Sequence, residues 1–272
     1  MKNSLKYFSI ITFIILVLLG CNQTPKEWKF KEKIMLNGIN PLGILVDGKG
    51  MWLSDVDRNR LVHTDMRGNI DFTQNELQRP MHISMENEKV FIPEFLDDRI
   101  STLSRNLLDS LQIDSDLDAP AGIDISGNVQ VIVDFYNHQL VLVVNGKTSI
   151  IGEKGHADGE LNYPTDVALY GHKIFVADAY NNRVQVFDYE GNVLKVIGWQ
   201  EKIRVAAGLT ISENRVFVTD FHGNRVLIYD FDGQLIKILE EQFDRPTDVY
   251  VLENILYVAN YKGGFISVFK NE

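Results

Sequence analysis

The chain has 272 residues and a formal net charge of −10, from 27 basic and 37 acidic side chains. A surface that binds nucleic acid needs clustered lysine and arginine, and the densest basic stretch here, residues 26–33, is interrupted by Glu27 and Glu32. Nucleic acid is therefore excluded as an expected partner. Because the chain has one cysteine, a disulfide within it is also excluded.

The first 20 residues have the pattern of a signal peptide. Lys2 and Lys6 precede an apolar run over residues 7–19, which is too short to span a bilayer. Removing residues 1–20, which contain two lysines and no acids, leaves 25 basic and 37 acidic side chains. About 250 residues then remain, enough for one domain.

Cys21 directly follows Leu18-Leu19-Gly20, and this sequence resembles the lipobox of bacterial lipoproteins. The resemblance implies cleavage before Cys21, lipid on its thiol, and a membrane-anchored protein of the bacterial cell envelope. Residues 21–27 would form the lipidated tether, and residues 28–272 the folded domain. Asn22 in place of aspartate favours the outer membrane. The alternatives are an ordinary secretory signal and an uncleaved anchor, each with an incidental cysteine.

Six copies of one segment fill residues 41–269. They begin, at intervals of 39 to 44 residues, with Pro41, Pro80, Pro120, Pro164, Ala206 and Pro246. In the fourth copy, alternating apolar residues predict strands at 165–169, 173–177, 183–188 and 193–197. A period near 40 residues with several short strands per copy is typical of a propeller. We therefore predict an all-β, six-bladed propeller of four-stranded antiparallel blades, with residues 103–111 the one stretch of uncertain type.

The two ends of the domain are predicted to complete one blade together. The last copy stops after a third strand at residues 265–269, and an unassigned strand-like segment at residues 28–35 precedes the first copy. Pairing these segments would complete the sixth blade and leave no strand missing from the ring.

The fourth copy is similar to NHL repeats, which are known from six-bladed propellers. The similarity rests on Val176-Ala177-Asp178 and Asn182-Arg183, preceded by Gly152 to Pro164, and it extends over residues 28–270. An acid, a turn residue and an arginine recur as Asp55, Asn59 and Arg60; Glu94, Asp98 and Arg99; and Asp220, Asn224 and Arg225. The third copy instead has Asp134, His138 and Gln139, and the sixth has Asn260, Gly264 and Phe265. A feature repeated in several blades is expected to build blades, not to perform chemistry.

Candidate site residues lie at one mouth of the central channel, where the strand starts and the second-to-third-strand turns should meet. Two positions beyond each copy's start stand Gly43, His82, Gly122, Asp166, Gly208 and Asp248. The three ionisable residues, His82, Asp166 and Asp248, form a candidate polar cluster. Aromatic residues in the neighbouring turns could stack on a ligand: Phe95, Phe135, Tyr136, Tyr180, Phe221 and Tyr261. Alternatively, the carboxylates cap neighbouring backbone amides and the aromatic rings pack between blades.

A divalent cation at His82, Asp166 and Asp248 is conceivable, but no other cofactor is expected. Residues 55–59 and 114–118 resemble the opening of a calcium loop but lack the glycine and glutamate of the EF-hand pattern. The remaining histidines are expected to be ordinary turn or surface residues.

Two classes of function remain open. The first is a non-enzymatic binding or scaffolding propeller that recognises a protein, peptide or glycan at the channel mouth; the lack of a nucleophile elbow, phosphate loop or paired-carboxylate motif favours it. The second is a metal-dependent enzyme of the lyase or lactonase type. Resemblance to amidating lyases of the NHL type would imply zinc on three channel histidines, whereas only His82 lies on an inner strand here. A carboxylate-based calcium site around Asp166 and Asp248 would still fit a lactonase.

Overall fold

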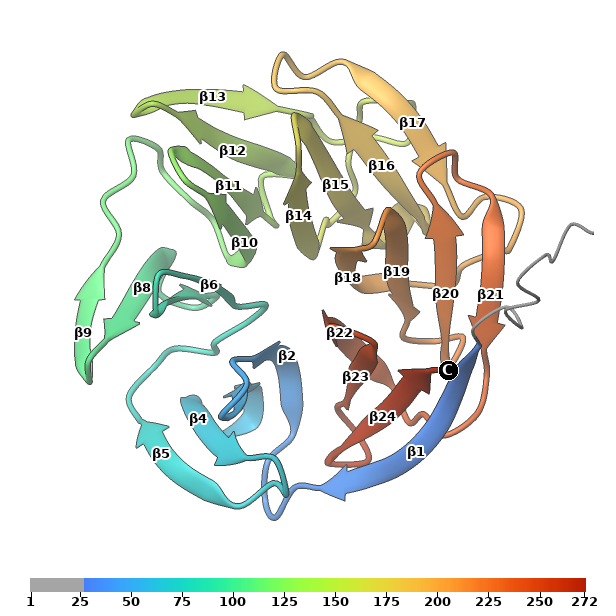
Figure 1. Ribbon diagram of the computed structural model, residues 1–272. Helices are drawn as coiled ribbons and strands as arrows, with labels where there is room; N and C mark the ends of the chain where they lie inside the picture. Colours follow the sequence, from blue (N-terminus) through green and yellow to red (C-terminus); the bar gives the residue numbers. More distant parts are fainter. Residues whose placement is uncertain (1–26) are drawn as a thin grey trace, which may run out of the picture.

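The computed structural model describes residues 27–272, which form six four-stranded antiparallel sheets arranged as blades around a central axis (Figure 1). The predicted all-β, six-bladed architecture is confirmed. Within the described range the helical elements are two short 3₁₀ turns, η1 (Val56–Arg58) and η2 (Ala179–Asn181), and no helix there could cross a membrane. The predicted signal peptide and Cys21 lie outside the described residues.

Each blade runs from an inner strand at the axis to an outer strand at the perimeter (Figure 1). Blade 1 contains β2 (Pro41–Val46), β3 (Gly50–Asp55), β4 (Arg60–Asp65) and β5 (Ile70–Gln74). Blade 2 contains β6 (Ser84–Glu86), β7 (Lys89–Glu94), β8 (Arg99–Ser104) and β9 (Leu107–Ser110). Blade 3 contains β10 (Pro120–Ser126), β11 (Val129–Asp134), β12 (Gln139–Val144) and β13 (Lys147–Ile151). Blade 4 contains β14 (Asp166–Tyr170), β15 (Lys173–Asp178), β16 (Arg183–Phe187) and β17 (Val193–Ile197). Blade 5 contains β18 (Ala206–Ser212), β19 (Arg215–Asp220), β20 (Arg225–Asp230) and β21 (Leu235–Leu239). Blade 6 contains β22 (Pro246–Leu252), β23 (Ile255–Asn260), β24 (Phe265–Asn271) and β1 (Trp28–Met35).

The stretch at residues 103–111, whose type the sequence left open, forms a hairpin between β8 and β9. Arg105 and Asn106 connect these strands with φ angles of 50° and 63°. Two successive residues with positive φ form the tight turn whose twist matches that of paired strands. The polar turn residues therefore decide against a helix in an otherwise leucine-rich stretch.

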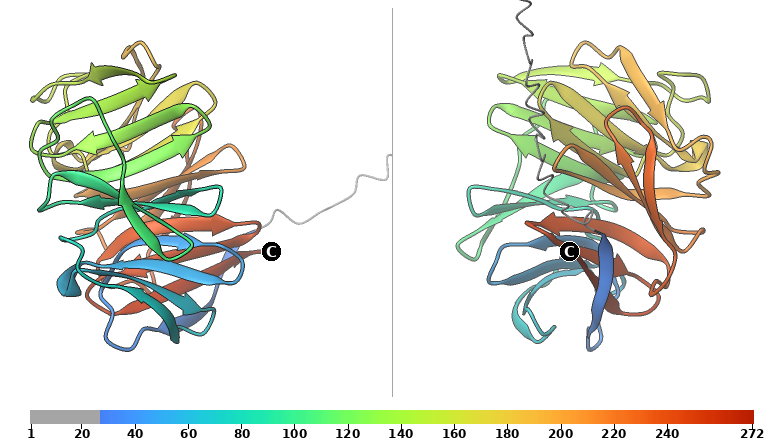
Figure 2. Two further views of the ribbon diagram at one scale, coloured as in Figure 1. Left: turned by 90° about the vertical axis from the view of Figure 1, so that its left-hand side faces the viewer. Right: turned by 45° about the vertical axis from the view of Figure 1, so that its right-hand side comes forward.

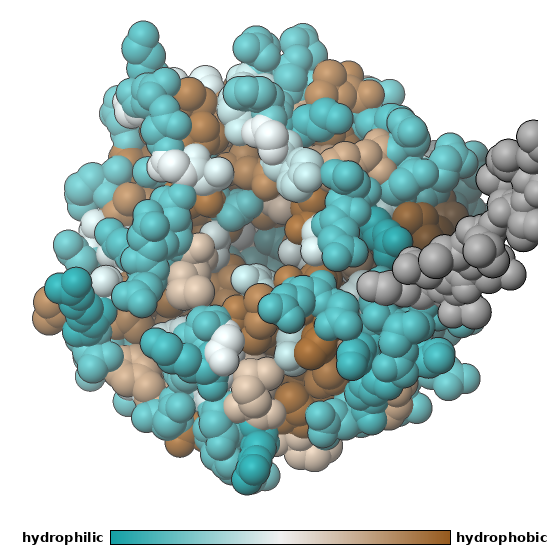
Figure 3. Space-filling view, in the orientation of Figure 1, coloured by the Kyte–Doolittle hydropathy of each residue, from teal (hydrophilic) through white to brown (hydrophobic). Residues whose placement is uncertain are grey.

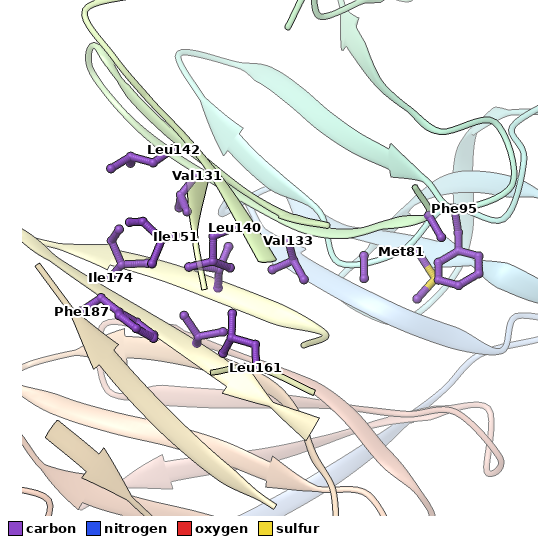
Figure 4. Close-up of a cluster of buried hydrophobic side chains, with 14 of the residues drawn as sticks. Met81, Phe95, Val131, Val133, Leu140, Leu142, Ile151, Leu161, Ile174 and Phe187 are labelled. Carbon is purple, nitrogen blue, oxygen red and sulfur yellow. The ribbon is translucent and has the colours of Figure 1, made fainter. Parts of the chain in front are cut away.

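The hydrophobic core lies between the faces of neighbouring blades. Successive side chains of a strand lie on opposite faces of the sheet. One set of apolar side chains therefore faces the preceding blade, and the other set faces the following blade. Between blades 3 and 4, the side chains of Val131, Leu140 and Leu142 pack in one buried cluster with Ile174 and Phe187 (Figure 4). Because each interface between blades buries such a cluster, the blades are held in a ring by ordinary side-chain packing.

Blade 6 is built from both ends of the domain. β1 pairs antiparallel with β24, from Trp28 opposite Asn271 to Met35 opposite Phe265. Backbone hydrogen bonds of 3.0 Å in both directions join Glu27 and Glu272. β1 and the C-terminus therefore lie next to each other at the perimeter (Figure 2).

Candidate functional site

One face of the ring carries the starts of the inner strands together with the turns between second and third strands; we call it the top face. Backbone hydrogen bonds join the two features in blades 2 to 6, and in blade 1 the amide of Asn40 donates to the side chain of Asp55 (3.2 Å). The amide of Tyr180 donates to Asn162 (3.1 Å), and that of Tyr261 donates to Arg245 (3.1 Å). The predicted meeting of these segments at one mouth is therefore observed.

In blades 1, 2, 4 and 5, the recurring arginine forms an ion pair with a fully buried acid and ties the turn to the start of the blade. In blade 4, Arg183 Nε donates to Asp178 (2.8 Å), and Arg183 Nη2 donates to the carbonyl oxygens of Ala157 and Glu160. The other oxygen of Asp178 accepts the amide of Asn162 (2.8 Å). Every oxygen of this carboxylate thus has a structural partner, as expected for a residue that builds the blade.

The turn residue four positions after the acid has a left-handed backbone in all six blades, with φ between 51° and 58°. Asn59, Asp98 and Asn224 use this position to accept the backbone amide of Arg79, Ala119 and Arg245, respectively. In blade 3 the ring of His138 does the same for Tyr163 (3.0 Å).

The third copy keeps these bonds with other side chains, and the sixth copy keeps the bond made by the residue at the acid's position. Gln139 takes the arginine's place and donates to Asp134 (2.9 Å), and Asn260 accepts the amide of Asp244 (2.9 Å). Asp55 of the first calcium-loop candidate likewise binds Arg60 and the amide of Asn40. The loop-like sequence at residues 55–59 is thus a blade turn.

At the axis, glycines alternate with ionisable side chains around the ring. His82, Asp166 and Asp248 come from blades 2, 4 and 6, while Gly43, Gly122 and Gly208 hold the equivalent places in blades 1, 3 and 5. A Cβ atom on Gly208 would lie 2.4 Å from the carbonyl oxygen of Thr247, and one on Gly43 would lie 2.7 Å from that of Met81. The inner strands approach so closely here that the glycines make room for the three side chains of the other blades.

The structure brings His82, Asp166 and Asp248 together, and we call these three residues the axial cluster. His82 Nδ1 lies 3.5 Å from Asp248 Oδ2 and 3.8 Å from Asp166 Oδ2. All three residues are 4–5% exposed. His82 Nδ1 is itself buried and has no hydrogen-bond partner among the described residues.

Both carboxylates of the axial cluster also cap backbone amides, as the alternative interpretation of the sequence stated. Asp166 accepts the amide of Val167 and, across the blade boundary, that of Leu209, each at 2.8 Å. Asp248 likewise accepts the amides of Val249 (2.7 Å) and Ile44 (2.9 Å). These bonds clamp each inner strand to its neighbour and fix the orientation of the carboxylates.

A further aspartate on an inner strand, the partly buried Asp124, makes the same clamp and was missed by sequence reasoning. It accepts the amides of Ile125 (2.9 Å) and Leu169 (2.7 Å) as well as the hydroxyl of Ser84 (3.0 Å). It stands two residues further along its inner strand than Asp166 and Asp248 do on theirs. The available signal was an acid on an otherwise apolar inner strand.

Burial perturbs the titration of these groups. Burial lowers the pKa of His82, but the charges of Asp166 and Asp248 outweigh it and the pKa is raised overall. Burial, opposed by the charge of His82, raises the pKa of Asp166 to about 7. Burial also raises the pKa of Asp124, against the hydrogen bonds that it accepts.

Beyond the axial cluster, away from the top face, lies a cavity of about 180 Å³. Its lining includes Asp124, Asp166 and Asp248, the hydroxyl-bearing Ser84 and Thr210, and apolar residues of the inner strands. The axis of the ring therefore offers a small acidic chamber.

On the top face, a groove of about 500 Å³ spans blades 1, 2, 5 and 6. It is lined by Leu42, Val56, Asp57, Asn59, Arg79, Leu96, Phe221, Thr247 and Tyr261. Two of the predicted aromatic residues, Phe221 and Tyr261, thus lie in the groove. The hydroxyl of Tyr261 donates to Asp57 (2.9 Å) and holds its ring in place.

The other predicted aromatic residues gather over blades 2 to 4. Their rings, with that of Tyr163, form a continuous patch. The centroid distances are 4.9–5.3 Å between Phe95 and Phe135, Phe135 and Tyr163, and Tyr163 and Tyr180, and Tyr136 lies 5.6 Å from Phe95. Phe95 is almost wholly buried, whereas Tyr136 and Tyr180 are 50% and 61% exposed. The exposed part of this patch is therefore formed by tyrosines.

Figure 3 shows one face of the ring, on which mostly hydrophilic side chains surround a central hollow.

Residues 161–187 match the family model of the NHL repeat. No curated protein matches the chain by sequence.

Solved structures share its fold. Virginiamycin B lyase from Staphylococcus aureus is 13% identical, with 90% of this chain and 100% of that chain covered and a TM-score of 0.67. The WD40 propeller domain of Doa1 is 11% identical, with 91% and 98% covered and a TM-score of 0.69. At identities of 11–13%, these neighbours establish the fold alone. One of them is an enzyme and the other is a WD40 domain. The chain is thus a six-bladed β-propeller that contains an NHL repeat.

Proposed function

We propose that this protein is a non-enzymatic binding propeller, anchored in the bacterial cell envelope through Cys21, that recognises a protein, peptide or glycan with its top face. The observation that carries the proposal is the groove on that face, together with the adjoining exposed tyrosines. Concave apolar surfaces with a few fixed polar groups are the usual form of a ligand site.

The chemistry of the groove suits a ligand with an apolar or ring-bearing part. Leu96, which lines the groove, is 59% exposed. The guanidinium of Arg245 lies 5.1 Å from the ring centroid of Phe221, and that of Arg79 lies 4.9 Å from the ring centroid of Phe95. Aromatic and arginine side chains of this kind contribute most of the binding energy at protein interfaces.

The acids and arginines of the top face favour binding over catalysis. The recurring pairs, such as Asp178 with Arg183, are engaged in blade structure. The axial cluster is buried, and its carboxylates hold backbone amides. A metal-dependent enzyme of the lyase or lactonase type would need reactive groups open to a substrate of ordinary size.

The anchor would leave both faces of the ring accessible. β1, which follows the predicted tether, lies at the perimeter of blade 6. Tethering at the rim keeps the top face free to meet a ligand at the membrane.

The experiment is a matched pair of surface variants. Leu96→Asp places a charge in the groove, and Leu107→Asp places the same charge on the outer strand of blade 2, where Leu107 is 74% exposed. Ligands captured by the native lipoprotein after cross-linking, or found on a glycan array, should be lost with L96D and retained with L107D. Equal retention by both variants would refute the groove as the binding surface.

A further inference from the structure

We infer that the axial cluster is a binding site for one divalent first-row metal ion, held by His82, Asp166 and Asp248 on the axis of the ring. The inference is independent of ligand binding at the top face. It rests on the distances within the cluster, the unpartnered nitrogen of His82, the fixed orientation of the carboxylates and the cavity beside them.

The distances between the cluster atoms fit a shared ion better than a hydrogen bond or a shared water. The separations of 3.5 and 3.8 Å from His82 Nδ1 to the two Oδ2 atoms exceed the usual N–H···O length of about 2.7–3.2 Å. Two groups bridged by one water at about 2.8 Å each, in tetrahedral geometry, would lie about 4.6 Å apart. Two ligands about 2.1 Å from one ion, at 110–125° to each other, lie about 3.4–3.7 Å apart.

His82 supplies the second, independent observation. Its Nδ1 is buried, faces two carboxylates and has no hydrogen-bond partner among the described residues. An unpaired polar atom at such a place is costly, and a bound ion would remove that cost. The candidate ligand atoms of the three residues all lie within 4.8 Å of one another.

The surroundings of the axial cluster are also those of a metal site. Each Oδ2 atom accepts one backbone amide and keeps a lone pair free, since a carboxylate oxygen can accept twice. The amides of Leu209 and Ile44 would thereby orient the ligands from behind, as outer-shell donors do. The cavity that borders Asp166 and Asp248 gives an access path and leaves a fourth position open.

The ligand set indicates the class of metal. One imidazole and two carboxylates suit zinc or manganese, whereas calcium would require six or more oxygen ligands. The three ligands come from alternate blades, so the ion would join blades 2, 4 and 6 across the axis.

The test uses residues 22–272 as purified wild type, His82→Gln, Asp166→Asn and Asp124→Asn. Asp124 is the matched control, because it clamps two backbone amides as Asp166 does but lies outside the axial cluster. After dialysis against Zn²⁺ and removal of free ion, elemental analysis should give one zinc per chain for wild type and D124N, and none for H82Q and D166N. Added Zn²⁺ should raise the melting temperature of wild type and D124N only.

A Co²⁺ titration keeps the inference testable if D166N fails to fold. Wild type should develop a visible absorption band at one equivalent, and H82Q, which leaves both amide clamps intact, should not. The inference is overturned if wild type retains no metal, if H82Q retains as much as wild type, or if D124N loses as much as D166N.

Discussion

The ion pairs of the recurring motif should differ in their contribution to stability according to how deeply each arginine is buried. In blade 4, the side chain of Arg183 is 6% exposed and that of Asp178 is fully buried. Asp178→Ala would leave the buried guanidinium with only Asp158, at 3.4 Å and 72% exposed, as a counter-charge, and the amide of Asn162 without its acceptor. Breaking a buried pair in this way costs about 3–5 kcal/mol.

In blade 2, the corresponding substitution should cost less. The side chain of Arg99 is 44% exposed, and Arg99 Nη2 also lies 3.2 Å from Asp97. Water and Asp97 can stabilise the guanidinium after Glu94→Ala, so the main losses are the hydrogen bonds from the amide of Gln78 and from the hydroxyl of buried Ser101. We expect a cost of about 1–2 kcal/mol.

Urea unfolding followed by tryptophan fluorescence measures this difference. With equal m-values, D178A should lose about 1–4 kcal/mol more than E94A, and in thermal melts roughly 2 °C or more in Tm. If E94A is destabilised as much as D178A, burial of the arginine does not set the strength of the pair, and the reasoning fails.

Three further predictions concern the ends of the domain, the anchor and pH. Deleting residues 28–36 should expose the edge of β24 and lower solubility or the cooperativity of unfolding; an unchanged melt would show that β1 is dispensable. Cys21→Ser should shift the protein from the detergent phase to the aqueous phase, and unchanged partitioning would refute the lipid anchor. Because burial raises the pKa of Asp124 above its ordinary 3.8, its ionisation disfavours the folded state. The contribution of Asp124 to the free energy of unfolding should therefore be greatest below about pH 4 and be lost as pH rises through its folded-state pKa. Asp124→Asn should therefore weaken the dependence of the free energy of unfolding on pH in this range. An unchanged dependence would contradict a raised pKa for Asp124.

Much of the fold could be predicted because each blade is a local unit. Hydrophobic alternation and turn residues lie within one copy, so the strands of blade 4 could be placed to within one residue at every end. The proximity of His82, Asp166 and Asp248 could be predicted for the same reason. They hold equivalent positions in three copies, and equivalent positions in a propeller lie at the same height around the axis.

What the sequence could not supply depends on contacts between blades. The clamp from Asp124 to Leu169 joins two inner strands whose relative height is set by packing, not by spacing in the chain. In the sequence, His138 departs from the asparagine or aspartate that four other copies have at this turn position. It nevertheless accepts the same kind of amide, which only the three-dimensional position of Tyr163 reveals.

The alternation of glycine and large side chains around the axis makes the propeller a partition and not a tube. Three side chains that are 4–5% exposed occupy the centre, and the glycines between them let the strands close in. The groove on one side and the acidic chamber on the other are then separate compartments. Each could be filled without displacing the occupant of the other, and any signal between them would have to travel through the axial residues themselves.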